Sequence, residues 1–294
     1  MKKLKMITNG VYDLSIIVPG IQPNNWERLY NQTKLAVKNY TFEIIFCGPK
    51  GIPSFFDDKA NVKFIRDFGA PSRCSQLAGY LAEGTYLTWL TDDGEIQEDS
   101  IDLAIDLIKE KEPIDIVAMR YTEGATEEDR LNEFPLDYYD PSYHADTRLP
   151  GIKEGWKTPC VMLLNTNYYR QLGGLDCRYE HTNMNVHDFG FRAQRNGSVV
   201  YYSPKIIMRC VWDPDRNAGN SPVIAAFVYN DLPLFRYDYC GKNVVNLRPL
   251  CIAYDNWRNN SPVWRRRFGN GFDTRQITPG EYSLNKGMPQ EDEE

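Results

Sequence analysis

Short apolar runs alternate with helical patterns over the first 120 residues of this chain, and this alternation constrains the fold more than any other feature. The apolar runs are residues 14–18 (LSIIV), 42–47 (FEIIFC), 62–68 (VKFIRDF), 85–90 (TYLTWL) and 114–120 (IDIVAMR). Between them, apolar residues recur at helical spacing in the segments 24–40, 72–84 and 100–111. Strands that alternate with helices predict an α/β fold with a mostly parallel sheet flanked by helices.

The turns that follow the apolar runs predict where a ligand binds. Pro19-Gly20 follows the first run, Gly48-Pro49 the second, and Asp92-Asp93 the fourth. In open α/β sheets, ligands bind beyond the carboxyl ends of the strands. We therefore expect these three turns to meet in one crevice.

Asp92 and Asp93 end a buried run, where charge is costly unless water, a partner or a cation satisfies it. Two carboxylates can hold a hard divalent cation, Mg²⁺ or Mn²⁺, whose remaining ligands are phosphates and water. Such a cation would neutralise a diphosphate leaving group. The alternative is a polar turn between a strand and a helix, because Asp-Gly turns are common.

Composition narrows the class of protein. With 294 residues, 42% of them apolar and 25% charged, the chain is long enough for one large domain or two lobes with a proper core. A net charge of −6 argues against a general nucleic-acid binder. Seven cysteines without a CxxC pair, and only three histidines, argue against a zinc cluster and predict buried thiols in a reducing compartment. No signal peptide or membrane-spanning run is found, so we expect a cytoplasmic protein.

The second half of the chain has weaker patterns. Residues 121–160 are polar and aromatic and predict a loop over the site or an insertion. Residues 159–176 predict a strand, a short helix and a stop at Gly173-Gly174, followed by a helix that ends near Gly197 and a strand over 198–202. Residues 223–235 predict a helix at their start.

Four stretches resemble, in order, the inverting family 2 glycosyltransferases of the GT-A fold. They are LSIIVPG, FEIIFCG, SQLAGYLAEGTYLTWLTDDGEI and LGGLDCRYEHTNMNVHDFGFRAQRNGSVVYYSP, and the resemblance covers residues 14–205. Gln76, Ala82 and Gly84 fall at the family's helix motif and Thr91–Asp93 at its metal motif. GGLD (173–176), His187-Asp188, Arg192 and Gly197 fall at its downstream elements.

The resemblance implies a GT-A type, Rossmann-like sheet with an acceptor-side half and a C-terminal extension. The transferase domain would be residues 1–215, with a nucleotide-binding half at 14–94 and an acceptor half at 95–215. Residues 216–294 would be an extension that acts as a lid or an oligomer contact and ends in an acidic, mobile tail.

The implied activity is transfer of a sugar from a nucleotide-diphosphate sugar to a hydroxyl acceptor such as a glycan. A UDP-sugar is favoured over a GDP- or dTDP-sugar, and Mn²⁺ or Mg²⁺ is the implied cofactor. Asp93 maps to the metal-contacting residue, with Asp92 beside the ribose or the metal's waters. The implied donor contacts are Pro19, Gly20, Gly48 and Arg73.

Asp188 maps to the family's catalytic base, which would remove the proton of the acceptor hydroxyl. The alternative is a helix charge paired with Arg192 at i+4. His187 stands where the family usually has Glu, and it is either an acceptor contact or a structural histidine. Trp156 either stacks on an acceptor sugar or belongs to the core.

Two alternative functions stay open. One is a catalytically degenerate protein that binds nucleotide sugars or carbohydrates, because Gly48 stands where many relatives carry an Asp and His187 replaces Glu, although Asp92, Asp93 and Asp188 are retained. The other is a nucleotidyltransferase, which ranks lower because VPGIQPNNWE lacks a basic, glycine-rich phosphate loop. No third metal ligand is assigned, because no His follows YYSP.

Overall fold

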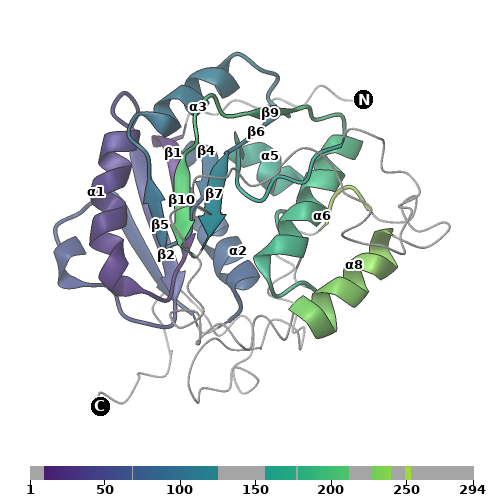
Figure 1. The fold of residues 1–294 in the computed structure, drawn as a ribbon, viewed down its shortest axis with the longest axis horizontal. Helices are drawn as coiled ribbons and strands as arrows, with labels where there is room; N and C mark the ends of the chain where they lie inside the picture. Colours follow the sequence, from purple (N-terminus) through teal and green to yellow (C-terminus); the bar gives the residue numbers. More distant parts are fainter. Residues whose placement is uncertain are drawn as a thin grey trace.

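Two β-sheets with helices packed around them make up the described part of the protein (Figure 1). The computed structural model describes residues 10–67, 69–124, 156–176, 178–211, 227–239 and 249–252. The central sheet has seven strands in the order β3-β2-β1-β4-β8-β6-β9, and a small sheet has three in the order β5-β10-β7.

The central sheet is parallel except for β8, which pairs antiparallel with β4 and β6. Its strands are β1 (Tyr12–Pro19), β2 (Phe42–Gly48), β3 (Val62–Arg66), β4 (Gly84–Trp89), β6 (Ile116–Ala118), β8 (Met162–Asn165) and β9 (Val200–Tyr202). The predicted α/β class with a mostly parallel sheet is therefore confirmed.

The helices follow the predicted periodic segments. They are α1 (Trp26–Ala36), α2 (Pro71–Leu81), α3 (Ser100–Lys109), α5 (Thr166–Gln171), α6 (Thr182–Arg195) and α8 (Leu232–Tyr239), with short 3₁₀ turns at Pro23–Asn25 and Ser54–Phe56 and a π-helical turn at Phe227–Asp231. On α1, Trp26, Leu29 and Tyr30 lie on the buried face. The Trp26 ring stacks on Phe46 of β2 with centroids 4.3 Å apart, which fixes α1 against the sheet.

The small sheet was not predicted. It consists of β5 (Gly94–Ile96), β7 (Tyr121–Gly124) and β10 (Met208–Val211), of which β10 pairs antiparallel with β5 and parallel with β7. Residues 121–124, which were expected to begin a loop, are thus a strand, and residues 125–155 lie outside the described residues. Strands of three or four residues carry too little periodicity to be recognised in a sequence.

The described part of the C-terminal extension packs against α6. Phe235 and Tyr239 of α8 form a second hydrophobic cluster with Tyr179, Met184 and Phe191, and α8 lies beside α6 on the opposite side of the molecule from α1 (Figure 1). The helix predicted in 223–235 is described from residue 227 onward. The boundary at residue 215 and the lid or oligomer role stay predictions, and the acidic tail lies outside the described residues.

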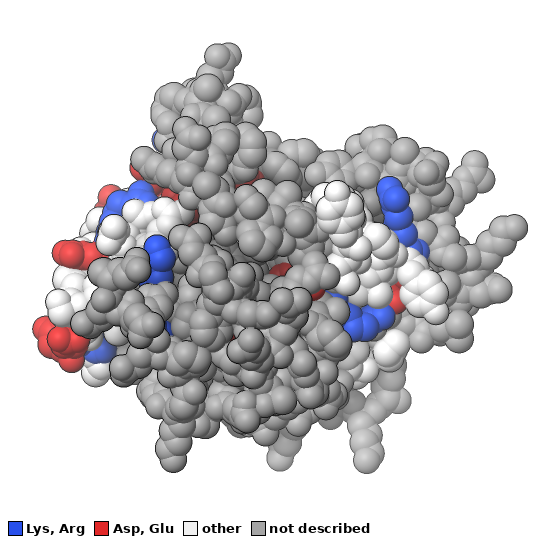
Figure 2. Space-filling model, turned by 90° about the horizontal axis from the view of Figure 1, so that it is seen from below, with Lys and Arg blue, Asp and Glu red and all other residues white. Residues whose placement is uncertain are grey.

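The described residues also answer three questions about membrane spans, cysteines and surface charge. Among the described residues no helix is long and apolar enough to cross a membrane. Every described cysteine is a free thiol: Cys47, Cys74 and Cys210 are buried, Cys160 is half-buried and Cys251 is exposed. On the face seen from below, described side chains of both charge signs are visible towards the sides (Figure 2).

Candidate functional site

A pocket of about 150 Å³ lies at the carboxyl ends of the parallel strands. Its described lining comes from the ends of β1 and β2, the turns after β1, β2, β3 and β4, the first turn of α2 and the first residue of α6. These residues are Pro19, Gly20, Ile21, Gln22, Cys47, Gly48, Pro49, Gly69, Pro71, Cys74, Thr91, Asp92, Asp93 and Thr182. The expectation that the turns after the first, second and fourth strands meet in one crevice is confirmed. This is the place where open α/β sheets bind their ligands.

Gly20 and Gly48 allow the turn after β1 to lie directly on the end of β2. The Gly20 N–H donates to the Cys47 carbonyl at 2.9 Å. A Cβ at Gly48 would lie 1.9 Å from the Gly20 carbonyl oxygen, and one at Gly20 would lie 2.9 Å from Asp92 Oδ2. Position 48 therefore has no room for a carboxylate side chain.

Asp92 anchors this turn from the other side. Its Oδ2 accepts hydrogen bonds from the Ile21 N–H at 2.7 Å, the Gln22 N–H at 2.6 Å and the Trp26 indole N–H at 3.2 Å. Burial raises the pKa of the Asp92 carboxyl, and the three hydrogen bonds oppose this shift. One oxygen of the Asp92 carboxylate is thus already bound within the protein.

Asp93 is the second carboxylate of this pair. It lines the pocket and is partly exposed. The described residues contain no group of three or more His, Cys, Asp or Glu side chains that could hold a metal. The donor set therefore fits a hard cation that arrives with its substrate and takes most of its ligands from phosphates and water, as Mg²⁺ commonly does. It does not fit a preformed, all-protein metal cage within the described residues.

Arg73, predicted to contact the nucleotide, is buried in an ion pair instead. Its Nε lies 3.0 Å from both carboxylate oxygens of Asp67, and its Nη2 lies 3.0 Å from Asp67 Oδ2. Asp67 also accepts the Gly69 N–H at 2.7 Å. The pair joins the end of β3 to the start of α2, so Arg73 shapes the pocket wall formed by Gly69 and Cys74 and is not among the lining residues.

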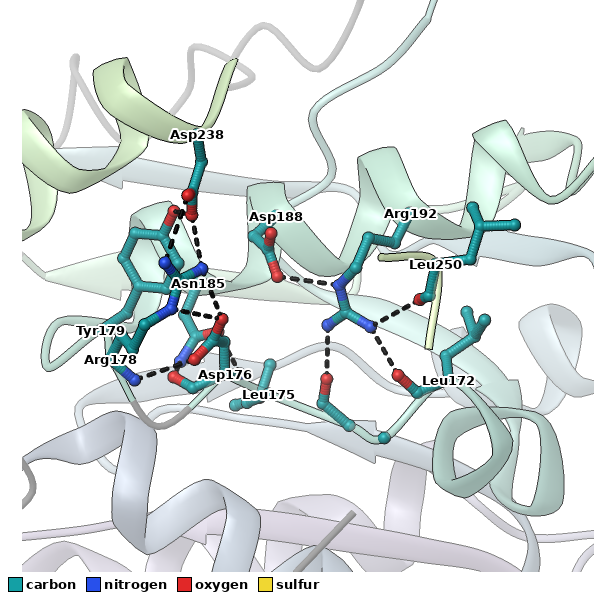
Figure 3. Close-up of polar contacts among 12 residues, drawn as sticks. Leu172, Leu175, Asp176, Arg178, Tyr179, Asn185, Asp188, Arg192, Asp238 and Leu250 are labelled. Carbon is teal, nitrogen blue, oxygen red and sulfur yellow. Dashed lines mark hydrogen bonds and ion pairs between the residues drawn. The ribbon is translucent and has the colours of Figure 1, made fainter. Parts of the chain in front are cut away.

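Asp188, predicted to be the general base, is fully buried on α6 and bound on both oxygens. Figure 3 shows its contact with Arg192. Its Oδ2 accepts from Arg192 Nε at 2.9 Å, and its Oδ1 accepts from the Tyr239 hydroxyl of α8. Asp188 is not among the residues that line the pocket. This environment is that of a structural ion pair at i+4, and we do not assign the base to Asp188.

Arg192 extends the same network into the rest of the molecule. Its guanidinium donates to the carbonyl of Leu172 at 2.6 Å, of Gly174 at 2.6 Å and of Leu250 at 3.3 Å (Figure 3). Leu250 belongs to the C-terminal extension. The pair therefore fixes the Gly173-Gly174 turn and a distant segment of chain onto α6.

Two further carboxylates of the extension hold the start of α6 beside the pocket. Asp231 accepts the His181 N–H at 2.7 Å. Asp238 binds Arg178 Nη2 at 2.6 Å and the Tyr179 hydroxyl at 3.0 Å (Figure 3). The sequence does not predict these contacts, because the partners are fifty or more positions apart and no local pattern connects them.

His187 and Trp156 lie outside the pocket lining. His187 Nε2 is 3.5 Å from the Cys160 thiol, and both side chains are half-buried. Trp156 packs on the second hydrophobic cluster, with its ring centroid 6.3 Å from that of Phe191. Trp156 therefore has the surroundings of the core alternative, and acceptor contacts by either residue stay predictions.

The cap formed by His181 predicts that the stability of the protein depends on pH. Its Nδ1 caps α6 by accepting the Asn183 N–H at 3.1 Å, and burial lowers its pKa from 6.5 to about 4. The unfolded chain therefore binds more protons between these values, and stability falls as pH drops through this window, by up to about 3 kcal/mol. In urea unfolding between pH 7 and pH 4, His181→Asn, which keeps a capping acceptor, should show a correspondingly weaker loss than wild type. Equal pH dependence in both proteins would contradict the prediction.

Comparison with known proteins finds structural likeness only. No family model matches the chain, and no curated protein matches it. A fragment of S. aureus TarS is 14% identical with a TM-score of 0.48, covering 74% of this chain, which in turn spans 66% of the length of that fragment. TarS in complex with UDP-GlcNAc is 15% identical with a TM-score of 0.48, covering 84% of this chain and 79% of that one. A mutant Drosophila β1,4-galactosyltransferase 7 with manganese, UDP-Gal and xylobiose is 11% identical with a TM-score of 0.45, covering 81% and 80%.

Proposed function

We propose that this protein is a metal-dependent, inverting glycosyltransferase that moves a sugar from a nucleotide-diphosphate sugar to a hydroxyl acceptor such as a glycan. The observation that carries the proposal is the pocket at the strand ends, in which the Thr91–Asp93 motif and the glycine turns at 20 and 48 come together. These are the elements through which the sequence resembles family 2 glycosyltransferases.

The charges of the pocket support metal dependence. Its described lining includes Asp92 and Asp93 but no Lys or Arg. A diphosphate beside Asp93 would be repelled unless a cation lay between them. Mn²⁺ or Mg²⁺ bound by Asp93 and the diphosphate would supply this bridge and would neutralise charge on the leaving group.

The remaining lining residues have binding and shaping roles. Gly20 and Gly48 present backbone without side chains, against which a nucleotide can lie closely, and Pro19 lies beside them in the pocket lining. Asp92 and the Asp67–Arg73 pair hold the surrounding turns in place. We favour UDP over GDP or dTDP as the nucleotide, and we propose that Trp156 and His187 lie on the acceptor side.

The experiment that tests this function is donor binding. UDP-, GDP- and dTDP-sugars are titrated by calorimetry with Mn²⁺, Mg²⁺ or EDTA into wild type, Asp93→Ala and the control Asp58→Ala, which removes an exposed carboxylate paired with Lys59. We expect one donor to bind only with metal, Asp93→Ala to weaken it by about 100-fold or more because the cation loses its protein ligand, and Asp58→Ala to match wild type. Binding that is indifferent to both EDTA and Asp93→Ala would contradict the proposal.

A binding protein without turnover is the second candidate. It is favoured by one observation. Asp188, the predicted base, is buried in an ion pair, and a buried carboxylate cannot contact an acceptor. Metal-dependent donor binding with neither transfer nor hydrolysis of the donor would establish this alternative.

A further inference from the structure

Glu123 on β7 is a carboxylate that the sequence pattern did not single out. The register of the small sheet places Glu123 opposite Cys210 of β10, and Cys210 opposite Gly94 of β5. Gly94 directly follows Asp93. Glu123, Cys210 and Gly94 therefore lie in one row across the three strands. This row begins next to Asp93, the last residue of the motif that lines the pocket.

The face on which Glu123 lies is the face directed at the pocket. Residues opposite one another on neighbouring strands project to the same face of a sheet. Cys210 Sγ and Met208 Sδ each lie 3.6 Å from the hydroxyl of Thr91, which lines the pocket. Glu123 shares this face, and it is exposed beside the pocket, outside the residues that line it.

Glu123 also lies close to the start of the acceptor half. Partial burial and the nearby negative charge of Asp93 raise the pKa of the Glu123 carboxyl, and burial and the charge of Glu123 raise the pKa of the Cys160 thiol. Cys160 in turn lies 3.5 Å from His187 on α6. Glu123 is therefore near the carboxylate proposed to hold the cation and near Cys160, which contacts α6 through His187.

We propose that Glu123, rather than Asp188, is the general base of the transfer, an inference that rests on the proposed function. Glu123 takes the proton of the acceptor hydroxyl while the acceptor oxygen bonds to the anomeric carbon. The bond from that carbon to the diphosphate oxygen breaks, and its electron pair leaves with the nucleoside diphosphate. The products are the glycosylated acceptor, the nucleoside diphosphate and protonated Glu123, which returns its proton to water.

The test compares Glu123→Gln with Glu95→Gln and Asp188→Asn. Glu95 is a matched control on β5, opposite Arg209 and so on the other face of the same sheet, where it pairs with Arg28 at 3.5 Å. Donor affinity is measured by calorimetry with Mn²⁺, and turnover by release of nucleoside diphosphate with water as acceptor. We expect Glu123→Gln to keep donor affinity and to lose turnover by about 100-fold or more, as loss of a general base does, and Glu95→Gln to match wild type in both.

The results distinguish failure of this proposal from failure of the proposed function. If wild type turns over a donor and Glu123→Gln retains a third or more of that rate, or if Glu123→Gln loses affinity and not turnover, Glu123 is not the base. The same holds if Asp188→Asn loses turnover at full affinity while Glu123→Gln does not. If wild type binds no nucleotide sugar, the proposed function fails and this assignment falls with it.

Discussion

Replacing Arg192 by methionine is expected to lower the free energy of unfolding by about 3–5 kcal/mol, the usual cost of breaking a buried ion pair by removing one partner. The substitution leaves the fully buried Asp188 carboxylate with the Tyr239 hydroxyl and without its cation. It also removes the donors to the carbonyls of Leu172, Gly174 and Leu250. Urea unfolding followed by circular dichroism measures the loss.

Arg28→Met is the matched control for this prediction. Arg28 forms an ion pair with Glu95 at 3.5 Å, but both side chains are more than a third exposed, so its loss should cost less than about 1 kcal/mol. The double variant Asp188→Asn with Arg192→Met should recover part of the loss, because no buried charge then stays unpaired. A cost of Arg192→Met no larger than that of Arg28→Met would show that the buried pair does not stabilise the fold.

The elements that the sequence predicted are those with local signals. The strands β1 to β4 are runs of five or more residues with apolar cores, and α1 to α3 have a buried face at helical spacing. Because parallel strands bring their carboxyl ends to one edge, the meeting of Gly20, Gly48 and Asp92 in a pocket followed from the alternation of elements alone.

The features that could not be predicted depend on partners far along the chain. Spacing of i+4 between Asp188 and Arg192 is the same for an exposed pair and for a buried one. The Asp188–Arg192 pair is in contact with Tyr239 and Leu250, which come from the C-terminal extension, and these distant contacts have no signal at the pair itself. Likewise, the short strands of the small sheet exist only because they pair with one another, so the position of Glu123 had no signal in the sequence.

Gly48 shows how a substitution that suggests lost function can have a steric cause. In the sequence, Gly48 stands where many members of the resembled family carry an Asp, which favours the degenerate alternative. In the structure the Gly20 carbonyl fills the space that a side chain at 48 would need. Backbone of the turn after β1 therefore fills the space beside the end of β2, and Gly48 still lines the pocket.

Asp92→Ala is expected to destroy the shape of this pocket. The variant leaves the N–H groups of Ile21, Gln22 and Trp26 without their common acceptor, and a buried donor without a partner costs about 1–3 kcal/mol. Because water can reach part of the opened turn, we expect a total loss of stability of about 3 kcal/mol. We also expect donor affinity to fall by about 100-fold, equivalent to about 2.7 kcal/mol, since the turn is one wall of the pocket.

Asp92→Asn separates this anchoring role from metal binding. An amide oxygen keeps an acceptor for the turn after β1 but is a weaker ligand for a hard cation. If Asp92 acts through the turn, Asp92→Asn should recover most of the stability and donor affinity that Asp92→Ala loses, and the concentration of Mn²⁺ needed for half-maximal donor binding should match that of wild type. If Asp92 is itself a ligand, Asp92→Asn should resemble Asp93→Ala, with stability retained and the metal requirement strongly raised. Calorimetric titration of donor at several Mn²⁺ concentrations distinguishes the two results.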